Sequence, residues 1–163
     1  MATIMELDST DWALLAALQA DASASNQGLA ERVGVSPPTA LRRLRRLREA
    51  GLITGQLAVL DEDRIAALQG HGLTVLAEVS LDQQGAEHLA AFERRAVQDD
   101  AVQQCYRVSP GPDFVLVARV RDMPCYQALA ERLFTQDANV RNVRAFFSVK
   151  RAKFAPQVPL SGV

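Results

Sequence analysis

The sequence lacks the residues that an enzyme, a zinc protein or a cofactor-binding protein usually needs. Its two cysteines, Cys105 and Cys125, form neither a Cys-x-x-Cys nor a Cys/His pattern, which argues against zinc and indicates reduced packing residues. The only histidines are His88, on an amphipathic segment, and His71, which we interpret as a hinge or surface residue rather than a pH sensor or metal ligand. No phosphate-binding glycine loop or paired carboxylate site accompanies them, so we expect no enzyme activity, no cofactor and no metal.

Long apolar runs and an excess of one charge are missing as well. No apolar run approaches the roughly 20 residues of a membrane span, and the N-terminus lacks the basic start and apolar core of a signal peptide, so we expect a cytoplasmic protein without membrane contact. The 18 basic and 19 acidic residues give a net charge of −1, so any DNA affinity must come from locally concentrated positive charge. A chain of 163 residues, 48% of them apolar, can form one large domain or two small ones.

The stretch from Gln27 to Gly51 has the pattern of a helix-turn-helix motif. A short helix over residues 29–33 is expected to end at Gly34, because glycine accepts the left-handed backbone of a tight turn. Ser36 is a suitable N-cap for a second helix, and Pro37 fits its first position. The second helix carries an apolar stripe and a set of arginines. The stripe is Leu41, Leu44 and Leu47, and the arginines are Arg42, Arg43, Arg45, Arg46 and Arg48.

An arginine-rich helix is often only a solvated surface, so charge alone does not assign this one to DNA. The glycine turn followed by a capped, proline-initiated helix favours nucleic-acid binding over that interpretation. A preceding helix is expected from Asp8 to Ala22, capped by Asp8, Ser9 or Thr10. We expect Trp12 to lie in its buried face rather than to stack on a base. The predicted core of the three helices is Leu15, Leu18, Leu29, Val33, Leu44 and Leu47.

A different pattern follows the helical region. A strand over residues 56–60 and a short helix over 61–68 are expected to lead to a boundary at the Gly-His-Gly sequence. Strands are then predicted over 73–81, 102–108, 114–120 and 140–149, with helices over 85–97 and 124–134. The order β-α-β-β-α-β is that of a ferredoxin-like fold. The second sheet face is apolar and needs a cover, which predicts a dimer.

We therefore expect an α+β protein, with an N-terminal three-helix, winged-type helix-turn-helix domain and a C-terminal ferredoxin-like βαββαβ domain. The predicted divisions are residues 1–55 for DNA binding, 56–72 for a linker strand and hinge, 73–150 for the ferredoxin-like dimerisation domain, to which the family resemblance given below adds effector binding, and 151–163 for a tail. The tail contains basic residues and two prolines. It is expected either to be disordered or to pack on a neighbouring subunit.

An ordered set of short motifs extends over nearly the whole chain. It comprises Leu7-Asp8, Asp11, Leu14-Leu15, Leu29-Ala30, Val35-Ser36-Pro37, Arg43, Arg46-Leu47, Ala50-Gly51, Ile53, Cys105-Tyr106-Arg107-Val108, Asp113-Phe114, Val120 and Val149-Lys150. In this set the chain resembles the leucine-responsive regulator/AsnC (Lrp/AsnC) family of transcriptional regulators. The resemblance implies a homodimer, often assembled into tetramers or octamers, that binds double-stranded DNA at a pseudo-palindromic operator.

The resemblance also implies which residues contact DNA. Candidates for base or phosphate contacts are Ser36, Pro38, Thr39, Arg42 and Arg43, because residues at the start of the helix approach base edges. Arg45, Arg46 and Arg48 are expected on phosphates or in solvent. For Arg46 an ion pair with an acidic residue of the same domain is an equal alternative.

Family members bind small effectors, usually amino acids, between ferredoxin-like domains. The corresponding candidates here are Ser109, Pro110, Gly111, Asp113, Val143 and Ala145. The chain departs from the family pattern at this place, because Pro110 follows Ser109 and removes a backbone donor. The effector is therefore less polar than a free amino acid, larger, or absent, and Asp113 either binds it or caps the turn. The alternatives are an effector-independent architectural DNA-binding protein and a ferredoxin-like small-molecule-binding protein or enzyme.

Overall fold

The computed structural model describes residues 6–69 and 72–160. The chain forms two compact units. The helical unit contains the residues up to Val59 together with the segment that starts at Phe154, and the sheet unit is Leu60–Lys153. The predicted tail is thus divided, because residues 151–153 belong to the sheet unit and the segment from Phe154 belongs to the helical unit. In the helical unit the side-chain amide of Gln19 exchanges two hydrogen bonds with the backbone of Val158 (3.0 and 2.7 Å).

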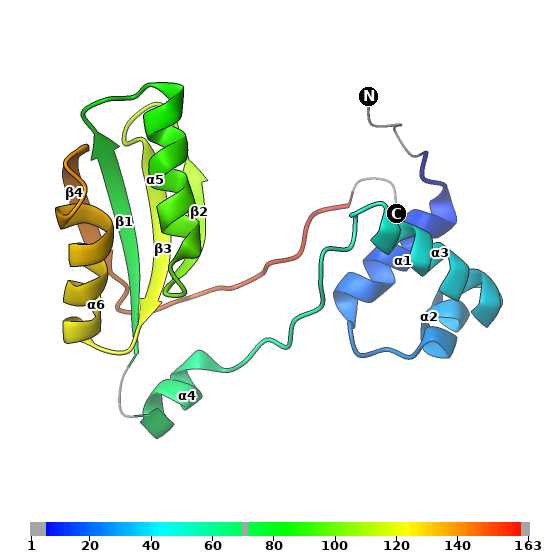
Figure 1. Cartoon of the computed structure of the whole chain (residues 1–163). Helices are drawn as coiled ribbons and strands as arrows, with labels where there is room; N and C mark the ends of the chain where they lie inside the picture. The colour runs from blue at the N-terminus through cyan, green and yellow to red at the C-terminus, as the bar shows by residue number, and fades with distance from the viewer. Residues whose placement is uncertain (1–5, 70–71, 161–163) are drawn as a thin grey trace. The chain divides into compact units, whose positions relative to one another are not determined.

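The helical unit contains α1 (Ser9–Ala20), α2 (Asn26–Val33) and α3 (Pro37–Glu49) (Figure 1). Asp8 caps α1 in a reciprocal capping box with Asp11. The Ser25 hydroxyl accepts from the Gly28 N–H (3.1 Å), so α2 begins earlier than the predicted residue 29. Gly34 ends α2 with φ 70°, which confirms the predicted left-handed turn.

The core of the helical unit differs from the prediction, because α1 and α3 bury other residues than expected and Val33 of α2 is only half-buried. Leu41 is 56% exposed, so the buried stripe of α3 is Ala40, Leu44 and Leu47. Leu14 is fully buried, whereas Leu15 and Trp12 are only half-buried. The buried cluster is Leu14, Leu18, Leu29, Ala30, Ala40 and Leu44.

The predicted strand over residues 56–60 is wrong. This stretch forms neither helix nor strand, and Leu57 is 83% exposed. A strand forms only where a second strand pairs with it by hydrogen bonds. The four-stranded sheet of the described residues does not include this stretch. The predicted short helix exists as α4 (Glu62–Gln69), with Asp61 accepting from the Arg64 N–H (3.0 Å). His71 lies outside the described residues.

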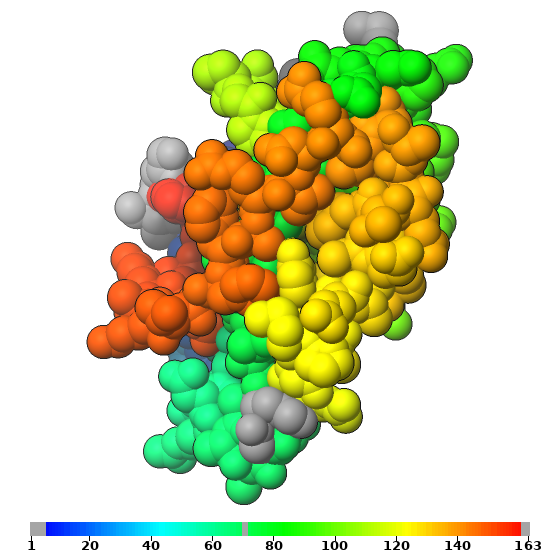
Figure 2. Space-filling view, turned by 90° about the vertical axis from the view of Figure 1, so that its left-hand side faces the viewer, coloured from blue at the N-terminus to red at the C-terminus, as the bar shows by residue number. Residues whose placement is uncertain are grey.

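The sheet unit has the ferredoxin-like arrangement. Its elements are β1 (Leu73–Leu81), α5 (Ala86–Gln98), β2 (Val102–Arg107), β3 (Phe114–Val120), α6 (Met123–Ala130), a π-helical turn (Glu131–Thr135) and β4 (Val140–Phe147). All strand pairs are antiparallel in the order β2-β3-β1-β4. Both helices cover one face of the sheet (Figure 1), and α6 lies beside the edge strand β4 on the side shown in Figure 2.

The two faces of the sheet differ in composition. The helix-covered face buries alternate residues of β1 and β3, from Val75 to Leu81 and from Phe114 to Val120, against Phe92 of α5 and Leu129 of α6. Cys105 and Cys125 pack against this core, and burial raises the pKa of the Cys105 thiol, as expected for unreactive packing residues. The open face carries the intervening side chains, including Leu76, which is 40% exposed.

Candidate nucleic-acid interface

The outer face of α3 carries the exposed candidates for DNA contact. Pro38, Arg42 and Arg45 follow one another at spacings of four and three residues, opposite the buried stripe. Arg45 forms an exposed ion pair with Glu49 (2.8 Å). Within the described part of the chain, neither Arg42 nor Arg48 has an ion-pair partner. Both guanidinium groups can therefore bind DNA without breaking an ion pair of the protein.

Arg43 and Arg46, by contrast, face α1. Arg43 Nη1 lies 2.9 Å from Asp11 Oδ1 and 2.7 Å from Asp8 Oδ2, and Arg46 also pairs with Asp11. Asp11 is fully buried. The hydrogen bonds that Arg43 donates to Asp8 and Asp11 raise the pKa of Arg43, and the bond to Asp8 lowers the pKa of the Asp8 carboxyl. The structure thus favours the ion-pair alternative for Arg46 and gives Arg43 the same role, which the sequence analysis missed.

The start of α3 is held by short polar contacts. The Asn26 amide donates to the Pro37 carbonyl (2.9 Å), which joins the beginnings of α2 and α3. Ser36 has the N-cap position, but its hydroxyl contacts the Thr39 hydroxyl (2.8 Å) instead of a backbone N–H, which corrects the predicted cap. Two hydroxyl groups and Pro38 therefore stand at the start of α3, at the end that reaches base edges in helix-turn-helix complexes.

The predicted effector residues of the β2–β3 loop lie at one end of the sheet. Ser109, Pro110 and Gly111 are exposed, the Ser109–Pro110 peptide is cis, and Gly111 has φ 121°. Asp113 Oδ2 accepts from the Leu81 N–H (2.7 Å), and its own N–H donates to the Val79 carbonyl (2.9 Å). Asp113 thus fixes the start of β3 against the end of β1, which supports the capping alternative.

Val143 and Ala145 were expected in the same effector site. They pair with Val79 and Ala77 of β1, and their side chains pack against the core on the helix-covered face. The loop and the start of β4 flank the end of β1 on opposite sides, about 10 Å apart at the strand spacing of a sheet. The structure therefore brings the two groups to one end of the sheet, with the Val143 and Ala145 side chains packed against the core.

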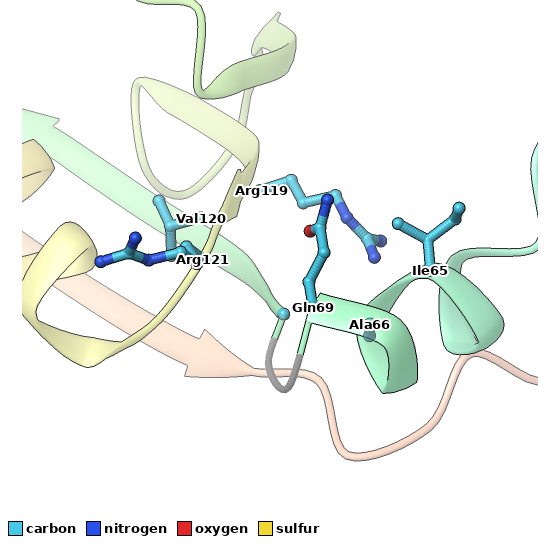
Figure 3. A pocket seen from close by; sticks show the side chains of 7 residues that line it. Ile65, Ala66, Gln69, Arg119, Val120 and Arg121 are labelled. Atoms are coloured by element: carbon cyan, nitrogen blue, oxygen red, sulfur yellow. The ribbon is translucent and has the colours of Figure 1, made fainter.

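Two surface hollows in the sheet unit contain none of these residues. One, of about 260 Å³, lies between α4 and the end of β3 (Figure 3), where Arg119 pairs with Glu62 and Arg121 pairs with Asp122 (3.0 Å). The other lies on the outer side of α5. The described residues hold no group of three or more His, Cys, Asp or Glu side chains that could bind a metal ion. No helix among them is long and apolar enough to cross a bilayer.

Comparisons with known proteins agree with this geometry. Residues 7–54 match winged helix-turn-helix DNA-binding domains, and residues 74–158 match the Lrp/AsnC ligand binding domain. The chain is 35% identical to the Bkd operon transcriptional regulator of Pseudomonas aeruginosa over 155 residues, 95% of this chain and 99% of that protein. It is also 35% identical to a leucine-responsive regulatory protein of Rhizobium meliloti over 160 residues, 98% and 100% of the two chains.

Solved structures give the same result. The structure of an AsnC family regulator from Agrobacterium tumefaciens matches with a TM-score of 0.82 at 27% identity. The match covers 94% of this chain and 97% of that protein's chain. A Neisseria meningitidis regulator solved as an L-Met complex has a TM-score of 0.82 at 26% identity, covering 96% and 98%. Fold and site thus define a DNA-binding transcriptional regulator with a ligand-binding domain, not an enzyme. The chain belongs to the Lrp/AsnC family.

Proposed function

We propose that the protein is a homodimeric regulator that reads a pseudo-palindromic operator with α3 and responds to a small effector bound by its sheet unit. The observation that carries this proposal is the division of the α3 arginines. Arg43 and Arg46 hold the helix against Asp11, whereas Arg42 lies on the outer face without an ion-pair partner among the described residues. A helix held rigidly with an exposed arginine near its start is suited to reading bases in the major groove.

The proposed DNA contacts divide by position along α3. Ser36, Pro38, Thr39 and Arg42 stand at its start and are assigned to base edges or nearby phosphates, and Arg45 is assigned to phosphates. In a symmetric dimer, two such helices would meet half-sites one helical turn, or a multiple of it, apart. A footprint with that spacing tests the assignment, and a footprint over a single half-site would contradict it. Because the proposed target is genomic DNA, the cytoplasm is the proposed compartment.

The open face of the sheet supports the proposed dimer. Leu76 of β1 lies at its centre, paired in register with Val117 of β3 and Phe146 of β4. Phe146 is 45% exposed. A row of apolar side chains across adjacent strands is unfavourable in water and is suited to burial against a second copy. Further assembly into tetramers or octamers is part of the same proposal.

Leu76→Glu should convert the dimer into a monomer, because a charge at the centre of the buried patch would lose its hydration without gaining a partner. Analytical ultracentrifugation over a range of protein concentrations measures the change. Val97→Glu is the matched control, since Val97 is 61% exposed on α5, on the other side of the sheet. A Leu76→Glu protein that remains a dimer with unchanged affinity would exclude this face as the interface.

The effector proposal rests on the exposed β2–β3 loop and on the L-Met complex of the Neisseria regulator. The Ser109 hydroxyl and the backbone groups around Gly111 are available for a polar head group. Pro110 has no N–H to donate, and one carboxylate oxygen of Asp113 already accepts a hydrogen bond from the Leu81 N–H. This loop therefore favours an amino-acid-like effector that depends less on polar contacts than a free amino acid does. The alternative is an architectural DNA-binding protein without an effector.

A thermal-shift screen against amino acids and related metabolites should identify a compound that raises the melting temperature. A ligand at 100 times its Kd stabilises the folded state by about 2.7 kcal/mol. Ser109→Ala should reduce the shift without changing the melting temperature of the free protein, since Ser109 is exposed. If no compound shifts the melting temperature of a protein that binds its operator, the architectural alternative replaces the effector proposal.

A further inference from the structure

The positive charge of the chain is concentrated at its C-terminal end. Residues 138–163 contain five basic side chains and no acidic one, whereas residues 1–137 contain 13 basic and 19 acidic side chains. The first 137 residues thus carry a net charge of −6 and the last 26 a net charge of +5. A segment of this length without any acid attracts polyanions even though the whole chain is nearly neutral.

Three of the five basic side chains of residues 138–163 lie on the segment that follows β4. Residues 148–160 follow β4 and form no helix or strand, and Lys150, Arg151 and Lys153 are exposed. Arg151 pairs with Glu62 of α4 (2.6 Å). For Lys150 and Lys153 no ion pair exists within the described ranges. We call residues 150–153 the basic connection.

The basic connection leads directly into a contact with the helical unit. Gln19 of α1 binds both backbone groups of Val158, as a neighbouring strand would. Lys153 is separated from Val158 by at most about 18 Å of extended chain. The chain itself therefore limits the distance between Lys153 and Val158, the residue that binds Gln19 of α1.

The helical unit alone offers few free cations for a DNA-binding domain. Of its six arginines, Arg43 and Arg46 pair with Asp11, Arg32 pairs with Asp21 (2.9 Å) and Arg45 pairs with Glu49. Arg42 and Arg48 are the two without an ion pair among the described residues. Non-specific DNA affinity comes almost wholly from phosphate neutralisation, and strongly salt-dependent binders make about 6–10 such contacts. Further cations are needed close to the helical unit.

We propose that Lys150 and Lys153 bind phosphates of the same duplex that α3 reads, as a second, sequence-independent DNA contact. This inference rests on the DNA-binding function proposed for α3. An irregular backbone can follow the phosphate backbone, and the flexible lysine side chain acts as a mobile point charge. An acidic protein surface is the competing partner, but the covalent link to a DNA-binding unit favours DNA.

The test compares the salt dependence of operator binding in the full-length protein. Lys150→Ala, Lys153→Ala and the double variant should each lower the slope of log K against log salt, by about 0.9 for every phosphate that the variant no longer neutralises. The ratio of operator affinity to random-DNA affinity should stay constant, because phosphate contacts carry no sequence information. Arg94→Ala removes one exposed charge from α5 and is the matched control, with an unchanged slope expected.

An unchanged slope in the double lysine variant overturns the inference. The same holds if the lysine variants alter dimer assembly but not DNA binding, which would assign the basic connection to a protein partner. Failure of the proposed function is recognised separately. In that case the unmodified protein shows no preference for any operator, and Arg42→Ala leaves its DNA binding unchanged.

Discussion

Replacement of Asp11 with alanine should lower the free energy of unfolding of the helical unit by about 3 kcal/mol. Asp11 is fully buried and binds two guanidinium groups, so its removal leaves Arg43 without its buried partner. Breaking a buried ion pair costs about 3–5 kcal/mol. We take the lower end, because the Arg43 and Arg46 side chains are 22% and 47% exposed and can turn towards water.

Trp12 makes this prediction directly measurable. It is the only tryptophan, it follows Asp11 in α1, and it is half-buried, so its fluorescence reports unfolding of the helical unit separately from the sheet. Urea titrations should show a lower midpoint for Asp11→Ala at an unchanged slope. Glu49→Ala removes an exposed ion pair from the same unit and should cost only about 0.3–0.5 kcal/mol.

The two arginines should differ in the same experiment. Arg43→Ala should cost more stability than Arg46→Ala, because Arg43 is less exposed and also bonds Asp8. Equal midpoints for Asp11→Ala and the unmodified protein would show that the ion pairs do not hold α1 against α3. The arrangement also means that loss of DNA binding on replacing Arg43 would not by itself show a DNA contact.

Local sequence signals predicted the helical unit because its boundaries depend on neighbouring residues. Gly34 and Ser25 determine the turn and the start of α2 through contacts within three or four positions. The Asp11–Arg43 pair joins positions 32 apart, and no periodicity indicates it. Asp11 was visible only as a favourable charge at the start of a helix, a role that equally suits an exposed side chain.

The strands of the sheet were predictable for a related reason, whereas the direction in which the β4 side chains point was not. Alternation of apolar side chains identified β1 and β3, since each buries every second residue. The same alternation places Val143 and Ala145 in the core once β4 pairs with β1. A one-residue change of register would have placed them on the open face, and the sequence contains no signal for that register. The stretch over residues 56–60 has strand composition, but no strand among the described residues pairs with it.

Arg42→Ala should abolish most of the operator preference while the helical unit stays folded. Arg42 is exposed and has no ion pair among the described residues, so its removal costs no packing. A bidentate arginine–guanine contact contributes about 1–3 kcal/mol of discrimination in each half-site, roughly 5- to 150-fold. Fluorescence anisotropy with operator and random DNA at one fixed salt concentration measures the ratio of the two affinities, and Trp12 fluorescence confirms the fold.

Two further variants separate base reading from charge. Arg42→Lys keeps the positive charge but loses the planar fork, so it should lose operator preference and retain the salt slope. Arg48→Ala removes an unpaired charge further along α3 and should lower the slope by about 0.9 for each half-site of the dimer at an unchanged preference. If Arg42→Ala keeps the preference, base reading belongs to the Ser36 and Thr39 hydroxyls at the start of α3. If instead Arg42→Ala loses the preference and Arg42→Lys keeps it, charge alone suffices at this position and Arg42 is a phosphate contact.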